Sequence, residues 1–363
     1  MKKERKSIIS PFAILTAVIF VTVGILFILS DINPTIADSL NDGICQKFRQ
    51  IMSWVGSLTS GSLIEIVILL IPLIVFLVIK GALKQNLLRD KIRYLINIVC
   101  VILLILSGHL MALGIAHNTT PISDKMSLSE VEVSEDNLAD VLTMLRDEIN
   151  LLAEEMPRDS DGVFRSQRTI GQISEEICLS YDKLALDYNI PKGYDSRAKE
   201  VFFSDVMSYL AISGIYTYPT GEANVNMNYP SYVNIFTAAH EMSHQRGILR
   251  ENEANFLAYL ITITSDDSEL RYSGLMNMYN YFASALYRTN KERYFSIHRE
   301  LNSFSRADYA ESSRVSDKFG DTIIEEISEK INDFYLKSSG TADGVVSYSR
   351  VVTLVLSYHS KNQ

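Results

Sequence analysis

The sequence contains little of what marks several common classes of protein. Its 363 residues include only three cysteines, with no Cys-x-x-Cys pair and no zinc-ribbon spacing. Cys100 lies in an apolar run and is expected to be a small buried hydrophobe. A disulfide between Cys45 and Cys178 is possible if both are extracytoplasmic, but nothing in the sequence favours it. Basic residues are scarce after residue 116, where 23 Lys or Arg stand against 37 Asp or Glu. This acidic balance excludes an electrostatic nucleic-acid surface, so no nucleic-acid partner is expected.

Three long apolar runs in the first 116 residues predict a membrane region. They cover about residues 8–30, 62–80 and 94–116, and each is long enough to cross a bilayer as a helix. The first run lacks the short core and small-residue cleavage site of a signal peptide, so it is expected to remain as an anchor. His109, in the third run, is expected to face another helix rather than bind a metal. The lipid bilayer is the predicted partner of residues 1–116.

The distribution of Lys and Arg predicts the orientation of these spans. Four basic residues precede the first span, and five lie between Lys80 and Arg93. The loop between the first two spans holds only Lys47 and Arg49, against three Asp. Because basic loops stay on the cytoplasmic side, we expect a multi-pass protein of the cell membrane with a cytoplasmic N-terminus. Residues 117–363 are then an extracytoplasmic domain.

The stretch around which the chain is organised is His240-Glu241-Met-Ser-His244. Residues i and i+4 lie on one face of a helix, so His240 and His244 can point two imidazoles at one metal ion. Glu241 is then placed to hold a water molecule and accept its proton. With only six histidines in the chain, a chance match to this pattern is improbable. The motif predicts one catalytic Zn²⁺ per chain, with Glu241 as the catalytic base.

A catalytic zinc site needs a third protein ligand, which is expected just downstream. Gly247 can adopt the positive φ that ends a helix, and the next carboxylates are Glu251 and Glu253. Glu251 and Asn255 are i and i+4 on a second helix, whereas Glu253 projects about 200° away from Glu251. We therefore expect Glu251 to be the ligand and Asn255 to orient it, with Glu253 a less favoured alternative.

The remaining sequence predicts mostly helices, including one that follows an N-cap at Ser134. Residues 214–218 and 223–228 alternate in polarity around a turn, which predicts a β hairpin just before the metal-binding helix. An extended substrate could pair with the edge of this hairpin. Val225 and Met227 are expected to point into the core. The alternative is an ordinary half-buried hairpin with a solvated Asn face. The fold class is therefore mainly α with a small β hairpin or sheet. Residues near the site that could contact substrate or stabilise an oxyanion are Glu222, Asn224, Asn226, Arg271, Tyr272 and Tyr281. For each tyrosine, a place in the core with a satisfied hydroxyl is the alternative.

Several blocks of the sequence resemble a known family. The Glu-x-x-Ala-Asn pattern from Glu251 is similar to the helix that supplies the third ligand in gluzincin-type metallopeptidases, and the short glycine turn resembles that of metzincins. Longer blocks that carry a resemblance are Ile32-Asn-Pro34, Met207–Tyr216, Thr220–Asn226, Phe236–Gly247, Glu251–Ala258, Arg271–Gly274 and Ser347–Val352. These blocks resemble the bacterial membrane-protein family filed as domain of unknown function 3810. The resemblance implies a membrane-attached, zincin-like protein and supplies no substrate.

These observations together predict a membrane-anchored zinc metallopeptidase that hydrolyses peptide bonds outside the cytoplasm. Glu241 would take a proton from the attacking water and pass it to the leaving amine. The competing hypothesis is a metal-stabilised extracytoplasmic sensor or assembly module without turnover. An intact Glu241 favours the enzyme, because a purely structural metal site has no use for a general base. The predicted substrate is a peptide or protein.

Overall fold

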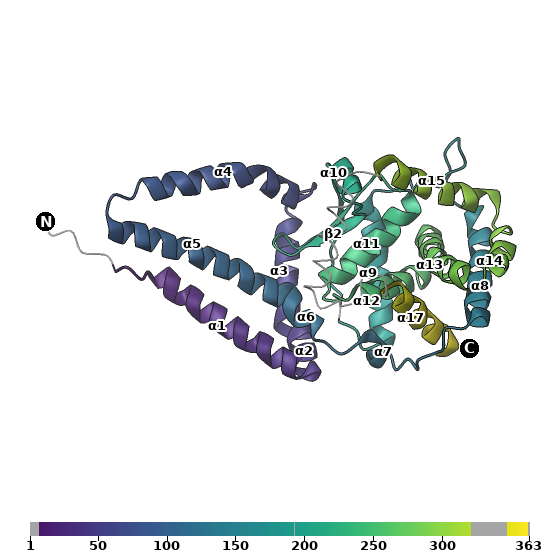
Figure 1. The fold of residues 1–363 in the computed structure, drawn as a ribbon, viewed down its shortest axis with the longest axis horizontal. Helices are drawn as coiled ribbons and strands as arrows, with labels where there is room; N and C mark the ends of the chain where they lie inside the picture. The colour runs from purple at the N-terminus through teal and green to yellow at the C-terminus, as the bar shows by residue number, and fades with distance from the viewer. Residues whose placement is uncertain (1–6, 192, 321–346, 362–363) are drawn as a thin grey trace.

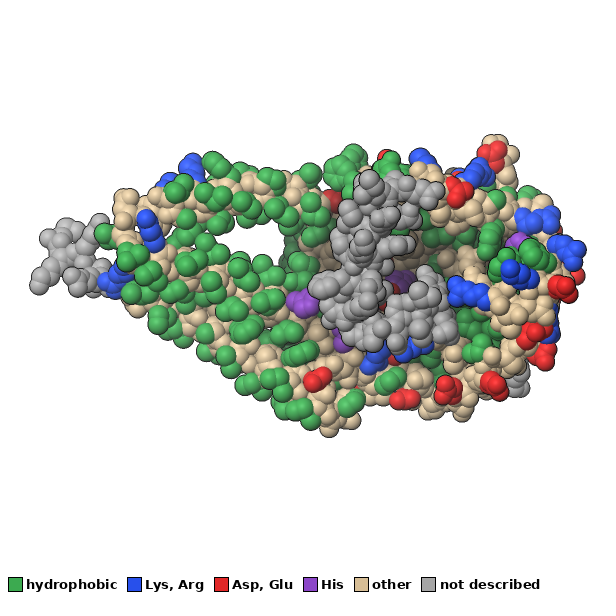
Figure 2. All heavy atoms as spheres, in the orientation of Figure 1, with side chains coloured by type: hydrophobic (Ala, Val, Ile, Leu, Met, Phe, Trp, Pro, Cys, Tyr) green, Lys and Arg blue, Asp and Glu red, His purple; other side chains and the backbone are tan. Residues whose placement is uncertain are grey.

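The computed structural model describes residues 7–191, 193–320 and 347–361. Among them, three helical segments are long and apolar enough to cross a membrane: α1 (Pro11–Ile32), α4 (Leu63–Leu83) and the continuous run Leu88–His117. The third segment consists of α5 (Leu88–His109), a π-helical turn η2 (Leu110–Gly114) and α6 (Ile115–His117). Figure 2 shows hydrophobic side chains over all three, with Lys and Arg gathered near their free end. The protein thus has a region compatible with a membrane.

The three apolar segments do not form a closed bundle. In Figure 1, α1 and α5 lie side by side, whereas α4 diverges from α5 and leaves an opening between them. No residue of α4 is buried. Near the free end, the Tyr94 hydroxyl donates to the carbonyl oxygen of Val78 at 3.0 Å, which joins α5 to α4. Helix α4 is therefore held mainly through its two ends.

A compact part follows the apolar segments and is mainly helical, with a three-stranded sheet. Before it, the loop between α1 and α4 folds into short helices that lie against the compact part. The loop contains α2 (Pro34–Leu40), the π-helical turn η1 (Asn41–Cys45) and α3 (Gln46–Gly56). The compact part contains α7 (Ile122–Lys125), α8 (Glu135–Ala153), α9 (Ile170–Asp187), α10 (Ser204–Tyr209), α11 (Ser231–Gln245), α12 (Glu251–Ile263), α13 (Ser268–Thr289), α14 (Lys291–His298), α15 (Ser303–Phe319) and α17 (Ser347–Lys361).

The sheet contains the predicted hairpin and one further strand. Strand β3 (Glu222–Val225) is central, pairs antiparallel with β2 (Gly214–Thr217) and pairs parallel with β1 (Ala198–Glu200). Strand β1 was not predicted, because three residues carry too little alternation to mark a strand. Because β3 lies between β1 and β2, β2 is an edge strand. It lies beside α11, the helix that carries the two histidines.

The burial of the hairpin differs from the prediction. Asn224 and Asn226 are fully buried, so the solvated Asn face is not found, and Met227 is 37% exposed instead of lying in the core. The Asn face is covered by polar partners: the Ser62 hydroxyl donates to Asn224 at 2.7 Å, and the Asn226 amide donates to Ser208 at 2.9 Å. Buried amides of this kind are stable because their donors and acceptors are paired.

Helix α11 lies in the middle of the hydrophobic core. It packs against α9, α12, α13 and β3, and residues 234–245 are buried with the exception of His240. Ala238 and Ala239 are fully buried, which allows neighbouring helices to approach closely. A helix enclosed on nearly all sides has little freedom to shift or rotate. The motif His240–His244 therefore lies on a helix that the core encloses on nearly all sides.

Other predictions have mixed outcomes. Ser134 caps α8 as predicted, since its side chain accepts from the N–H of Asn137. The helices predicted for the remaining sequence include α15, which ends at Phe319; residues 321–346 lie outside the described residues. Cys45 and Cys178 are both free, so the possible disulfide between them is not formed.

Candidate metal centre

The structure brings the two motif histidines and Glu251 together. One ligand atom from each of His240, His244 and Glu251 lies within 4.8 Å of the others, a grouping found among the described residues. The His240 Nε2 lies 3.3 Å from Glu251 Oε2, and the His244 Nε2 lies 3.5 Å from Glu251 Oε1. In a tetrahedral zinc site with bonds of about 2.0–2.1 Å, neighbouring ligand atoms are about 3.3 Å apart. The three donors therefore fit a Zn²⁺ ion.

The glycine turn between the ligands explains how a local sequence achieves this geometry. Gly247 has a φ of +89°, the left-handed conformation that glycine adopts without strain. The N–H of Gly247 donates to His244 O at 2.9 Å, and the N–H of Ile248 donates to Ser243 O at 3.1 Å. These two bonds form a Schellman motif, which satisfies carbonyls at the end of α11 and reverses the chain. Glu251 then begins α12 beside His244.

The second ring nitrogen of each histidine has a different environment. His244 Nδ1 lies 2.8 Å from the carbonyl oxygen of Ile248, a bond that directs Nε2 toward Glu251. His240 Nδ1 is buried without a hydrogen-bond partner among the described residues. Asn255, predicted to orient a ligand, is half-buried, and among the described residues it makes no hydrogen bond to either histidine. The backbone of Ile248, which no side-chain pattern reveals, supplies the orienting contact instead.

Proximity couples the protonation of the three groups when no metal is bound. Burial alone would disfavour the charged form of His244, but the charge and hydrogen bond of Glu251 outweigh it and raise the pKa of His244 to about 9. Burial also opposes ionisation of Glu251, yet His244 and His240 hold the pKa of that carboxyl well below its usual range. A zinc ion would therefore displace a proton as it binds.

Glu241 lies against the edge strand of the sheet. Its side chain is buried, and a Cβ added at Gly214 would come within 2.8 Å of Glu241 Oε1. The N–H of Tyr216 donates to the Glu241 carboxylate. Burial raises the pKa of Glu241, although the charges of the nearby histidines oppose the shift. A raised pKa suits a group that accepts and returns a proton.

A residue from the loop between α1 and α4 contacts the turn at Arg246 and Gly247, which is called the ligand turn below. Arg49 on α3 is fully buried and donates to the carbonyl oxygens of Asn41, Ala112 and Arg246 at 3.0, 3.3 and 3.5 Å. A Cβ on Gly247 would lie only 2.4 Å from an Arg49 nitrogen, so only glycine permits this approach. The positive charge sits at the C-terminal end of α11, where the helix dipole favours it. Sequence reasoning counted Arg49 only as a loop charge and missed this contact.

Glu253, the alternative ligand, faces away from the cluster. Its carboxylate accepts from the N–H of Ile122 at 3.0 Å and from Arg250 at 3.0 Å. Arg250 also donates to the carbonyl oxygens of His117 and Thr119, at 2.9 and 2.6 Å. Glu253, together with Arg250, therefore ties α12 to the C-terminal end of the third apolar segment.

The hairpin candidates Glu222, Asn224 and Asn226 are not brought to the metal cluster. The buried Glu222 carboxylate accepts from the N–H groups of Leu63 and Ile64, at 2.8 and 3.0 Å, and thereby caps the first turn of α4. Its charge is paired with the buried Lys199 at 2.7 Å. These contacts attach the sheet to α4 and leave no carboxylate oxygen directed at a substrate.

Arg271 and Tyr272 are likewise engaged elsewhere. The Tyr272 hydroxyl donates to Asp308 at 2.5 Å in the interior, and an Arg271 nitrogen lies 3.7 Å from Glu148 on the surface. Neither contact involves a residue of the metal cluster. The predicted oxyanion role of these two side chains therefore has no geometric support. Helix α13 follows the motif closely in sequence, but it does not bring these side chains to the cluster of His240, His244 and Glu251.

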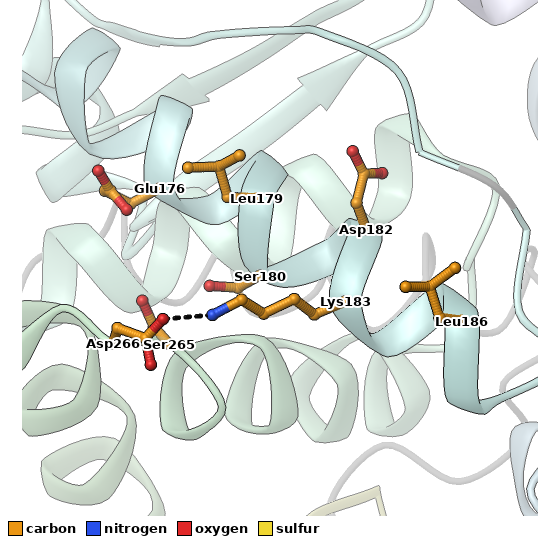
Figure 3. A pocket seen from close by; sticks show the side chains of 8 residues that line it. All are labelled: Glu176, Leu179, Ser180, Asp182, Lys183, Leu186, Ser265 and Asp266. Atoms are coloured by element: carbon orange, nitrogen blue, oxygen red, sulfur yellow. Dashed lines mark hydrogen bonds and ion pairs between the residues drawn. The ribbon is translucent and has the colours of Figure 1, made fainter.

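A surface pocket lies between α9 and the turn that joins α12 to α13. Figure 3 shows its lining, which contains the ion pair of Lys183 with Asp266 and the apolar side chains of Leu179 and Leu186. The pair is solvent-exposed, and exposed pairs of this kind contribute little. None of the three metal donors lines this pocket, so it is not part of the candidate site.

Comparisons with known proteins place the chain in a family without adding a reaction. No curated protein and no solved structure matches the chain. A family match covers residues 37–356, which includes the loop with Arg49, the sheet and both ligand helices. Because the match extends over most of the sequence, the protein belongs to the family described as protein of unknown function (DUF3810).

Proposed function

We propose that this protein is a membrane-anchored, zinc-dependent peptidase whose site lies outside the cytoplasm. The observation that carries the proposal is the clustering of His240, His244 and Glu251 within 4.8 Å, with Glu241 next to the first histidine in sequence. Two histidines and a carboxylate are the donor set of many hydrolytic zinc sites, which keep a fourth position open. The ligand helix, glycine turn, second helix and adjacent edge strand support a zincin-like arrangement.

The roles of the protein groups follow from their positions. His240, His244 and Glu251 would hold one zinc ion, and a bound zinc would supply the Lewis acidity that polarises a peptide carbonyl. Glu241, with its raised pKa, accepts a proton from the attacking water and returns it to the leaving amine. The reaction consumes one water: a carbon–oxygen bond forms, the carbon–nitrogen bond breaks, and the amine gains the proton.

The membrane placement is part of the same proposal. The apolar segments span the bilayer, with residues 1–6 and the turn between α4 and α5 on the cytoplasmic side, because basic residues gather there. The loop that contains α2 and α3 then lies outside with the metal centre, in agreement with the Arg49 contacts. The substrate compartment is therefore extracytoplasmic.

Metal analysis of the purified full-length protein tests the proposal. We expect one zinc per chain in the wild type, and loss of zinc in His240→Ala and Glu251→Gln, because two remaining ligands bind too weakly. Glu253→Gln is the matched control, since it changes a nearby glutamate that contacts Ile122 and Arg250 instead. Zinc retained in His240→Ala would refute the ligand set. A zinc protein that cleaves no peptide library would favour the sensor hypothesis.

A further inference from the structure

The edge of β2 that pairs with no strand among the described residues lies beside the proposed general base. The N–H of Asn226 donates to Ser213 O, and hydrogen-bonded pairs alternate along an antiparallel ladder. Ile215 therefore directs its backbone groups toward β3, whereas those of Gly214 and Tyr216 point to the free edge. The bond from the Tyr216 N–H to Glu241 agrees with this assignment. An extended peptide that paired with this edge would pass next to Glu241.

The same strand leads from Glu241 to the third apolar segment. Just beyond β2, the Tyr218 hydroxyl donates to the carbonyl oxygen of Ile105 on α5 at 3.1 Å. The ring of Tyr218 also meets that of His109 edge to face, with 5.5 Å between the ring centroids. His109 was predicted to face another apolar helix; it is exposed, and its ring contacts Tyr218 of the hairpin. At about 3.3 Å per residue, the four residues of β2 cover about 13 Å between the two regions.

The region reached by this strand is the opening between α4 and α5. Figure 1 shows the hairpin at the base of this opening, and Figure 2 shows the gap between the two helices with apolar side chains on both sides. Ile105, whose carbonyl receives the Tyr218 hydroxyl, is 54% exposed. No residue of α4 is buried, although the Glu222 carboxylate fixes its outer end. The edge strand thus connects the metal centre to a laterally open, apolar space.

We propose that the substrate is the juxtamembrane segment of a polypeptide with an N-terminal membrane anchor, which reaches the metal along β2 from the opening between α4 and α5. This inference rests on the proposed peptidase function. Antiparallel pairing, the commoner arrangement, makes a substrate run from the α5 end of β2 toward Glu241, so the anchor precedes the cleaved bond. The length of β2 places that bond about four to six residues beyond the membrane-embedded part.

The apolar opening favours this occupant over a soluble peptide. Residues of a substrate that extend past Tyr218 meet the apolar surface of α5, where burial contributes about 25 cal/mol per Å² of apolar area. A polar soluble segment would gain nothing there and would lose hydration of its backbone. A membrane anchor already resides in this environment, so its adjoining segment is delivered to the strand edge without that cost.

Cleavage of matched peptide libraries tests the inference with the zinc-loaded, full-length protein in lipid nanodiscs. One library joins eight randomised residues directly to an N-terminal, 20-residue Leu/Ala anchor. A second inserts 20 Gly/Ser residues between the anchor and the same randomised residues, and a third is soluble. We expect the directly anchored library to be cut at least tenfold faster than the other two, within about six residues of the anchor. The spacer library controls for concentration at the membrane.

Photo-crosslinking supplies a second readout that does not require turnover. In Glu241→Gln protein, a photoreactive residue in place of Ile105 should capture the directly anchored library. The matched control replaces Ile25, which is 53% exposed on α1, on the other side of α5 from α4. Capture from Ile105 but not from Ile25 supports entry through the opening, and equal capture from both contradicts it.

The cleavage outcomes distinguish this inference from the function on which it rests. If the soluble or spacer library is cut as fast as the directly anchored library, the membrane route is wrong and the peptidase function stands. If the zinc-loaded wild type cuts no library, the proposed function fails and the inference fails with it. Rapid cutting of the directly anchored library alone supports both.

Discussion

Arg49→Met removes the buried guanidinium beneath the ligand turn and is expected to weaken zinc binding from a distance. Arg49 is fully buried and donates to three carbonyl oxygens, at 3.0, 3.3 and 3.5 Å. Leaving a buried acceptor unpaired costs about 1–3 kcal/mol, and the two longer bonds favour the low end of that range. The three acceptors together therefore give an expected loss of about 3–4 kcal/mol in the free energy of unfolding.

Part of this loss acts on the metal centre, because one of the three carbonyls belongs to Arg246, between His244 and Glu251. If about half of the loss falls on the ligand turn, the zinc affinity falls by about 1–2 kcal/mol, or roughly five- to thirtyfold. Competition with a chromophoric chelator in detergent measures this change, and thermal unfolding measures the stability. Lys47→Met is the matched control, since Lys47 is exposed on the same helix. An unchanged affinity in Arg49→Met, or an equal loss in Lys47→Met, would refute the reasoning.

Three further predictions follow from the contacts of the site. Zinc binding at pH 7–8 should release about one proton, because the pKa of His244 is raised to about 9 in the metal-free protein and a ligand must be deprotonated. The zinc affinity should therefore fall about tenfold per pH unit below pH 9. Calorimetry in buffers of different ionisation enthalpy measures the proton release, and its absence would contradict this prediction. Glu253→Gln should keep zinc but lower the free energy of unfolding by about 1–2 kcal/mol, because the charged acceptor of the Ile122 N–H is lost. Thermal unfolding measures this decrease. Loss of zinc in this variant would instead identify Glu253 as a ligand. A cysteine in place of the exposed Leu186 should react with an impermeant maleimide on intact cells, whereas one in place of the exposed Leu87 should not; the reverse pattern would invert the orientation.

The features of the site that sequence reasoning located are the local ones. His240 and His244 are one helical turn apart, and Gly247 reverses the chain within a Schellman motif, so the geometry depends on few neighbouring residues. The phase argument that separated Glu251 from Glu253 is also local. In the structure, Glu251 lies with the histidines and Glu253 lies against Ile122.

The features that sequence reasoning missed depend on contacts between distant segments. Arg49 and Arg246 are 197 positions apart, and no periodicity links an arginine in a loop to a helix end. Strand β1 is three residues long and is defined only by its pairing with β3. Asn224 and Asn226 were expected to be accessible because polar side chains usually mark the solvated face of a strand. The alternation of polar and apolar residues does not show whether another segment covers that face. Here α4 and the preceding loop cover the Asn face.

The comparison of wild-type and Glu241→Gln protein tests the central claim most directly. Both proteins should contain one zinc per chain, because the amide replaces no ligand atom. Hydrolysis of the directly anchored library should fall by about 10²–10⁴-fold in the variant, since an amide cannot accept the proton of the attacking water. Equal hydrolysis by the two zinc-loaded proteins, or a wild type without bound zinc, would contradict the account.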